Sequence, residues 1–185
     1  VEPPHRVTPA DATWAAQAGR IVSRVKTACG AKALRVDHVG ATAVPGLAAR
    51  DVIDIQVTVE SLAAADEVAE ALLAAGYPRI DDVAGDDVIS DARSTVERFD
   101  HSDERGLWHK RVHASADPGR PTNVALRVDG WPNQQYALLV VDWLVANRDV
   151  RDEYQTASDA DTEERWLRDA YRRAWQWADR IGWRP

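Results

Sequence analysis

Polar side chains occupy every second position in three segments of this sequence, and together they could bind a charged ligand. Alternate residues of a β-strand point to the same face of a sheet. We therefore expect one polar face to gather Asp54, Gln56, His109, Arg111, His113, Asn123 and Arg127. Guanidinium groups bind phosphate through paired hydrogen bonds, so this mixture suits a phosphate-bearing ligand. A solvated sheet face whose charges pair with one another would show the same alternation, and that interpretation stays open.

The loop from residue 40 to residue 46 is the second element that could contact a ligand. It contains Gly40, Pro45 and Gly46, which is incompatible with regular structure and predicts a shaped turn. Backbone N–H groups in such a turn can hold an anion. We predict a phosphate site formed by this loop and the strands. Its residues are Gly40, Ala41, Thr42, Arg111, His113 and Arg127.

Periodicity and turn residues predict the elements that position these side chains. Strands are expected over 34–39 and 52–59, with weaker strand signals over 95–101. Strands 108–115 and 123–129 flank a Pro-Gly-Arg-Pro turn, which predicts an antiparallel hairpin. Helices are expected over 8–30, 61–76, 132–147, 150–157 and 161–181. Thr8 would cap the first helix and Ser61 the second.

These elements predict an α+β fold with a mixed sheet and helices packed on one of its faces. The other face would then meet solvent or a cleft, and it would carry the polar residues. A helical C-terminal portion, residues 131–185, would complete the same domain. The acidic run over residues 81–87 is expected to be a solvated loop.

Composition limits the class of protein. The chain has 185 residues, of which 45% are hydrophobic and 29% charged, enough for one globular domain with a core. A net charge of −7 argues against a general nucleic-acid binder. No apolar run suggests a membrane span, and the single cysteine, Cys29, cannot form an internal disulfide. We expect a cytoplasmic protein without a membrane or nucleic-acid partner. The absence of Met fits a domain taken from a longer chain.

The segment from Asp37 to Ile55 reads DHVGATAVPGLAARDVIDI and resembles the signature of the GrpB family. That resemblance implies a nucleotidyltransferase-like fold, in which a Gly-Ser turn holds a nucleotide phosphate and two carboxylates on the next strand hold Mg²⁺. Gly40 and Ala41 take the place of the turn, Asp54 that of the first carboxylate and Gln56 that of the second. Ala41 lacks the hydroxyl and Gln56 lacks the charge. We therefore expect a weak Mg²⁺ and ATP site at most, with Asp54 as a vestigial catalytic residue.

Residues 123–134 and 137–144 are similar to the GrpB domain that follows the kinase domain in actinobacterial dephospho-CoA kinases. This resemblance implies a single domain over 1–185, the C-terminal part of a longer chain, with the kinase domain as its partner in cis. The kinase would phosphorylate the 3′-hydroxyl of dephospho-CoA with ATP in coenzyme A biosynthesis. That chemistry needs a Gly-x-x-x-x-Gly-Lys-Ser/Thr loop, which these residues lack.

We therefore expect a non-catalytic accessory domain. Two alternatives remain open at this point. One is a free-standing GrpB protein that binds a nucleotide or transfers a nucleotidyl group, and the other is an interaction module with a vestigial pocket.

Overall fold

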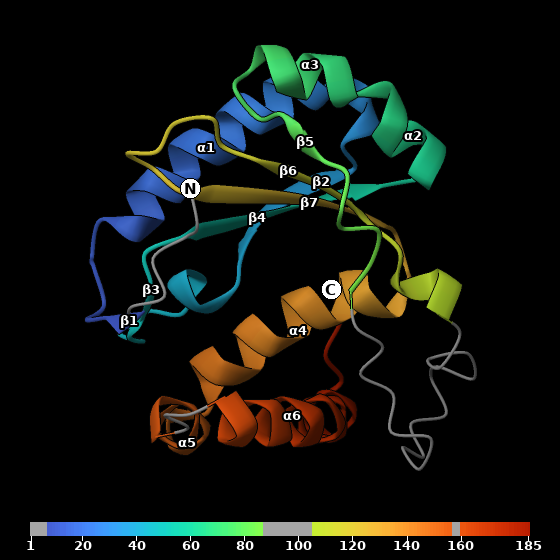
Figure 1. The fold of residues 1–185 in the computed structure, drawn as a ribbon. Coiled ribbons are helices and arrows are strands. Elements are labelled where there is room, and N and C mark those ends of the chain that lie inside the picture. The colour runs from blue at the N-terminus through green and yellow to red at the C-terminus, as the bar shows by residue number, and fades with distance from the viewer. Residues whose placement is uncertain (1–6, 87–104, 157–159) are drawn as a thin grey trace.

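A five-stranded mixed sheet runs through the middle of the protein (Figure 1). The computed structural model describes residues 7–86, 105–156 and 160–185. The strands of the sheet are β2 (Arg35–Val39), β4 (Ile53–Val59), β7 (Thr122–Val128), β6 (Arg111–Ala114) and β5 (Arg79–Ile80), in that spatial order. Only the β4–β7 pair is parallel among these neighbours. The predicted mixed sheet and the predicted β6–β7 hairpin are both confirmed, and the strand candidate 95–101 lies outside the described residues.

Helices α1 (Trp14–Cys29), α2 (Leu62–Glu67) and α3 (Ala69–Ala74) cover one face of the sheet. The alternation in β4 explains this, because Ile53, Ile55, Val57 and Val59 are fully buried among the apolar side chains of these helices. The Ser61 hydroxyl accepts a hydrogen bond from the N–H of Ala64 and caps α2, as predicted.

The predicted start of the first helix at Thr8 is wrong. Residues Val7–Thr8 form strand β1, which pairs with β3 (Ala49–Arg50). The Thr8 hydroxyl donates to the carbonyl of Ala49 instead of capping a helix, and α1 begins at Trp14. A strand partner about 40 residues away along the chain outweighs the local capping pattern here.

The second face of the sheet is also covered, which corrects the expectation that it is open to solvent or a cleft. Helix α4 (Pro132–Ala146) crosses this face, and α5 (Arg148–Thr156) and α6 (Ala160–Ile181) lie beyond it (Figure 1). Aromatic rings pack between α4 and α6. The rings of Tyr136 and Tyr171, for example, meet edge-on with their centroids 4.9 Å apart. No helix among residues 7–86, 105–156 and 160–185 is long and apolar enough to cross a membrane.

Candidate functional site

The register of the central strands divides the predicted polar residues between the two faces of the sheet. In the β4–β7 pair Asp54 is opposite Asn123, and Thr58 is opposite Arg127. In the β6–β7 pair Arg111 is opposite Leu126, and His113 is opposite Val124. Paired residues point to the same face. Arg111 and His113 therefore lie on the face covered by α1–α3, and their predicted place beside Arg127 is wrong.

On that face, Arg111 and His113 each bind a neighbouring group of the protein. The Nε of Arg111 lies 2.7 Å from an Asp66 carboxylate oxygen of α2, and its Nη2 lies 3.1 Å from the other oxygen. His113 is 1% exposed, and its Nδ1 lies 2.9 Å from the carbonyl oxygen of Tyr77. Burial lowers the pKa of His113. The structure thus holds a neutral imidazole in the core, with Nδ1 at the Tyr77 carbonyl and Nε2 buried without a partner among the described residues.

His109 lies just before β6, and its backbone forms a bridge with Gly85. Its backbone carbonyl accepts a hydrogen bond from the side chain of Asn133 at 3.2 Å, and in this way the His109 backbone contacts α4.

The glycine loop and Asp54 are brought together as predicted. Gly40 has φ +73°, and a Cβ added there would lie 2.6 Å from the Oδ2 of Asp54. Only glycine permits both this backbone conformation and this close approach. After Gly40 the chain makes a turn of 3₁₀-helix over Ala41–Ala43. The buried Thr42 hydroxyl lies 2.9 Å from His38 Nε2 and donates to the carbonyl of Val52 at 3.3 Å, which fixes the loop against β4.

Asp54 is half-buried beside this loop. Its Oδ1 accepts a hydrogen bond from Asn123 Nδ2 at 2.9 Å. Burial raises the pKa of Asp54, and the Asn123 hydrogen bond together with the charges of Arg127 and Lys110 opposes that rise. A carboxylate with a raised pKa next to a glycine turn is a typical functional-site feature.

Gln56 is fully buried, and both ends of its amide are already used. Its Nε2 donates to the carbonyl of Gln134 in α4 at 3.0 Å. Its Oε1 accepts from Arg127 Nη1 at 2.9 Å. The carbonyl oxygen that was expected to assist a metal therefore binds a guanidinium.

Asp86 completes the site, and sequence reasoning missed it. Arg127 donates from Nε and Nη2 to the two carboxylate oxygens of Asp86, at 2.8 and 3.1 Å. Lys110 pairs with the same carboxylate, and Asn133 of α4 donates to it at 3.1 Å. The expectation that the whole acidic run is solvated is therefore wrong at Asp86. The two cations hold the pKa of Asp86 down at about 2 against the effect of its burial.

These residues do not fit Mg²⁺. The ion needs several oxygen ligands, among them carboxylates. Asp54 is the one carboxylate at the predicted position, Gln56 is engaged by Arg127, and two cationic side chains stand close by. Within the described ranges no group of three or more His, Cys, Asp or Glu side chains is placed to hold a metal ion. The arrangement is a polar cluster whose charges are balanced internally, and phosphate binding at the Gly40 loop stays a prediction.

Replacing Gly40 by alanine tests the contact with Asp54, and Gly46 in the same loop provides a matched control. Gly46 has φ +78°, but an added Cβ there meets nothing within 4 Å. We expect G46A to lose about 1–2 kcal/mol of unfolding free energy, the cost of a left-handed conformation for a residue with a Cβ. G40A should lose at least about 1 kcal/mol more, because its Cβ also meets the carboxylate. Equal losses in urea unfolding would contradict the close approach.

Asp86→Asn tests the charge cluster through its pH dependence. The folded-state pKa of Asp86 lies near 2, below the ordinary 3.8, so the ionised group stabilises the fold above about pH 4–5. Its side chain is 21% exposed, and the shift corresponds to about 2 kcal/mol at pH 7, lost as the pH falls towards 2. D86N should show that loss at neutral pH and a flatter stability profile between pH 5 and 2. Asp82→Asn, an exposed change in the same loop, should alter urea unfolding by less than about 0.5 kcal/mol.

Comparison with known proteins supports the overall fold. The chain is 18% identical to a protein whose structure is described as the crystal structure of conserved protein GrpB from Enterococcus faecalis, with a TM-score of 0.69. The match covers 92% of this chain and 98% of that chain. At this identity the likeness shows the fold alone, and it agrees with the predicted α+β class with a mixed sheet.

Relatives at higher identity are longer proteins. The chain is 61% identical over 198 residues to a protein named dephospho-CoA kinase from Mycolicibacterium paratuberculosis, a match that covers 98% of this chain and 49% of the relative. A protein of the same name from Mycobacterium leprae is 57% identical over 200 residues, with the same coverage. The chain thus spans about half the length of these relatives. The sequence model described as GrpB protein matches residues 4–177. The chain therefore belongs to the GrpB family.

Proposed function

We propose that this chain is a non-catalytic accessory domain of a dephospho-CoA kinase and acts beside a kinase domain of the same polypeptide. The observation that carries the proposal is the 61% identity, along 98% of this chain, to proteins of that name of which it spans only half. The remaining half of such a protein would carry out the ATP-dependent phosphorylation. Coenzyme A biosynthesis and a cytoplasmic location follow from the proposal.

The sequence supports a division of labour between the two halves. Phosphoryl transfer from ATP in this class of kinase needs a glycine-rich loop that ends in Gly-Lys-Ser/Thr. No Gly-Lys pair occurs anywhere in the 185 residues. This domain is accordingly proposed to stabilise, position or regulate the kinase domain.

The geometry of the polar cluster also disfavours nucleotidyl transfer by this domain. Two-carboxylate catalysis would need a second negative charge at the place of Gln56. Gln56 is neutral, and its amide oxygen accepts a hydrogen bond from Arg127, which is itself bound by Asp86. A nucleotide phosphate would have to compete with Asp86 for Arg127 and Lys110.

A free-standing nucleotide-binding protein or nucleotidyltransferase is the second candidate. One observation favours it, namely the raised pKa of Asp54 directly against the Gly40 turn. A carboxylate whose pKa is raised by burial beside a specific partner is a candidate functional residue.

A magnesium titration separates the two candidates. We expect calorimetry of the 185-residue chain to give a Mg²⁺ dissociation constant no tighter than about 1 mM, because one carboxylate and two nearby cations disfavour the ion. Asp54→Asn should leave the signal unchanged. Binding that is tighter by about tenfold or more and is lost in D54N would move the assignment to the second candidate.

The accessory role is tested beside the kinase domain. The remaining half of the M. paratuberculosis relative would be prepared alone, mixed with this chain, and joined to it. We expect the joined form to raise the melting temperature of the kinase half by at least about 2–4 °C, the shift that corresponds to roughly 1 kcal/mol for a domain of this size. This chain alone should not phosphorylate dephospho-CoA. Identical melting temperature and turnover in all three preparations would contradict the accessory role.

A further inference from the structure

A cavity of about 280 Å³ opens beside α1 on the face of the sheet opposite the Gln56–Arg127 cluster. Its walls come from α1, from the segment after β6 and from the start of β7. The residues that matter for its chemistry are Gln17, Arg20, Arg24, Tyr77, Ser115 and Arg120. None of the residues of the candidate site described above lines it.

Positive charge dominates this cavity, although the whole chain carries a net charge of −7. Three of its lining residues are arginines, and Asp117 is the one carboxylate among them. The Asp117 carboxylate accepts a hydrogen bond from the backbone N–H of Gly119 at 2.8 Å, and Arg120 is paired with Asp51, so the net positive charge of the cavity comes from Arg20 and Arg24. A basic cavity in an acidic protein attracts small anions selectively.

Two of the arginines project from one face of α1. Arg20 and Arg24 are one helical turn apart and both are exposed. In the described part of the chain neither forms an ion pair with a carboxylate. Like charges at this spacing repel each other and destabilise a helix, so the arrangement has a cost that a bound anion would remove.

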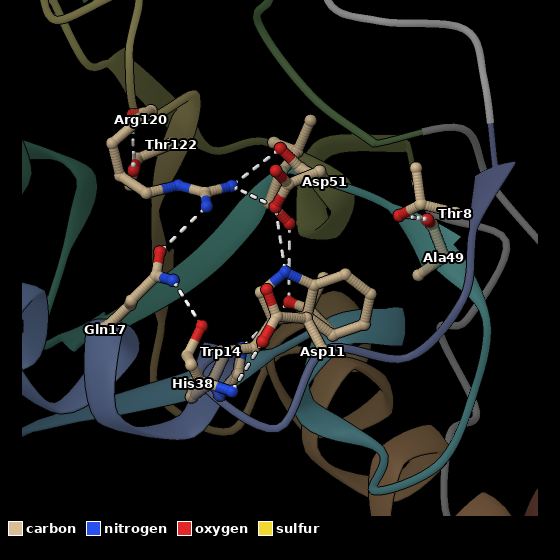
Figure 2. A network of polar contacts seen from close by, with 12 residues as sticks. Thr8, Asp11, Trp14, Gln17, His38, Ala49, Asp51, Arg120 and Thr122 are labelled. Atoms are coloured by element: carbon tan, nitrogen blue, oxygen red, sulfur yellow. Dashed lines mark hydrogen bonds and ion pairs between the residues drawn. The ribbon is translucent and has the colours of Figure 1, made fainter.

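The third arginine is held in place from two sides, as Figure 2 shows. Arg120 Nη1 donates to Gln17 Oε1 at 2.8 Å. Its Nη2 donates to the carbonyl oxygen of Asp51 at 2.7 Å and to the Asp51 carboxylate at 2.6 Å. The Nε of Arg120 is buried and has no hydrogen-bond partner among the described residues. Because both Nη groups are bound and the Nε is buried, Arg120 forms a rigid wall of the cavity and is not a free donor.

Uncharged groups complete the walls. The Ser115 hydroxyl accepts from the backbone N–H of Asp117 at 3.1 Å, which leaves its own hydrogen available to donate. The buried Tyr77 and Ile21 supply an apolar surface beside the cations. The cavity is small for a ligand site, where roughly 300–1,000 Å³ is usual, so it has room for a phosphate or pyrophosphate group with a little attached carbon.

We propose that this cavity binds a small phosphate-bearing anion, either a free pyrophosphate or the phosphate end of a larger molecule. The proposal goes beyond the accessory role, which does not require it. Bidentate guanidinium contacts from Arg20 and Arg24 would hold the phosphate oxygens, with Ser115 as an additional donor and Arg120 as the fixed wall beside them.

Calorimetry of the 185-residue chain at fixed ionic strength tests the proposal, with inorganic pyrophosphate and ADP as the two probes. We expect saturable binding of pyrophosphate. The variant R20Q/R24Q should bind it at least about tenfold more weakly, because two charge-assisted contacts are lost. Tighter binding of ADP than of pyrophosphate would assign the cavity to the phosphate end of a larger molecule, and the reverse order would assign it to the free anion.

The control is R148Q/R180Q, which removes two exposed arginines from α5 and α6 and lowers the charge equally. It should change the affinity less than twofold, and thermal melting should confirm that both variants are folded. The proposal is overturned if the unmodified chain shows no saturable heat with either probe, or if R20Q/R24Q keeps its affinity. Neither outcome changes the result expected when this chain is joined to the kinase half, so the anion-binding proposal and the accessory-role proposal can fail separately.

Discussion

The fully buried amide of Gln56 joins the three parts of the structure that define the candidate site. One end of it binds the backbone of α4, and the other binds Arg127 of β7. A buried amide that lost either partner would cost about 1–3 kcal/mol, so β4, β7 and α4 are fixed relative to one another. The closed second face of the sheet and the orientation of Arg127 both depend on this side chain.

Arg127 then determines what the polar cluster can do. In a metal-dependent site with two carboxylates, a divalent ion would balance their negative charge. Here a guanidinium fixed in the protein supplies the positive charge, and Asp86 supplies the carboxylate that balances it. Lys110 and the ionised Asp54 add one further charge of each sign, so the cluster is balanced without a ligand. This balance is a reason to propose a structural role for it.

Much of the fold could be predicted from the sequence because it rests on local patterns. A few neighbouring residues are enough to predict the apolar positions of β4, the Ser61 cap and the turn between β6 and β7. The placement of the Gly40 loop against Asp54 was also correct, and it came from the resemblance to the GrpB signature.

Features that depend on distant contacts could not be predicted. Alternation shows which residues of β6 share a face with Arg111, but not which face of the sheet that is. Only the pairing of β6 with β7 decides this. Asp86 lies in an acidic run that looks solvated, and its burial depends on Arg127, 41 residues further along the chain. The basic cavity likewise combines α1 with Arg120, 103 residues from Gln17, a distance at which single-sequence patterns carry no signal.

The contact between Gln56 and α4 also constrains the order in which the domain can form during synthesis. The two bonded residues, Gln56 and Gln134, are 78 positions apart in the chain. At roughly 5–20 residues per second a ribosome needs about 4–16 s to make that stretch. During this time the amide of Gln56 must stay hydrated, so the second face of the sheet stays wet until α4 emerges. The helices after residue 131 therefore cover this face last, and a chain that ended before them would leave the second face of the sheet uncovered.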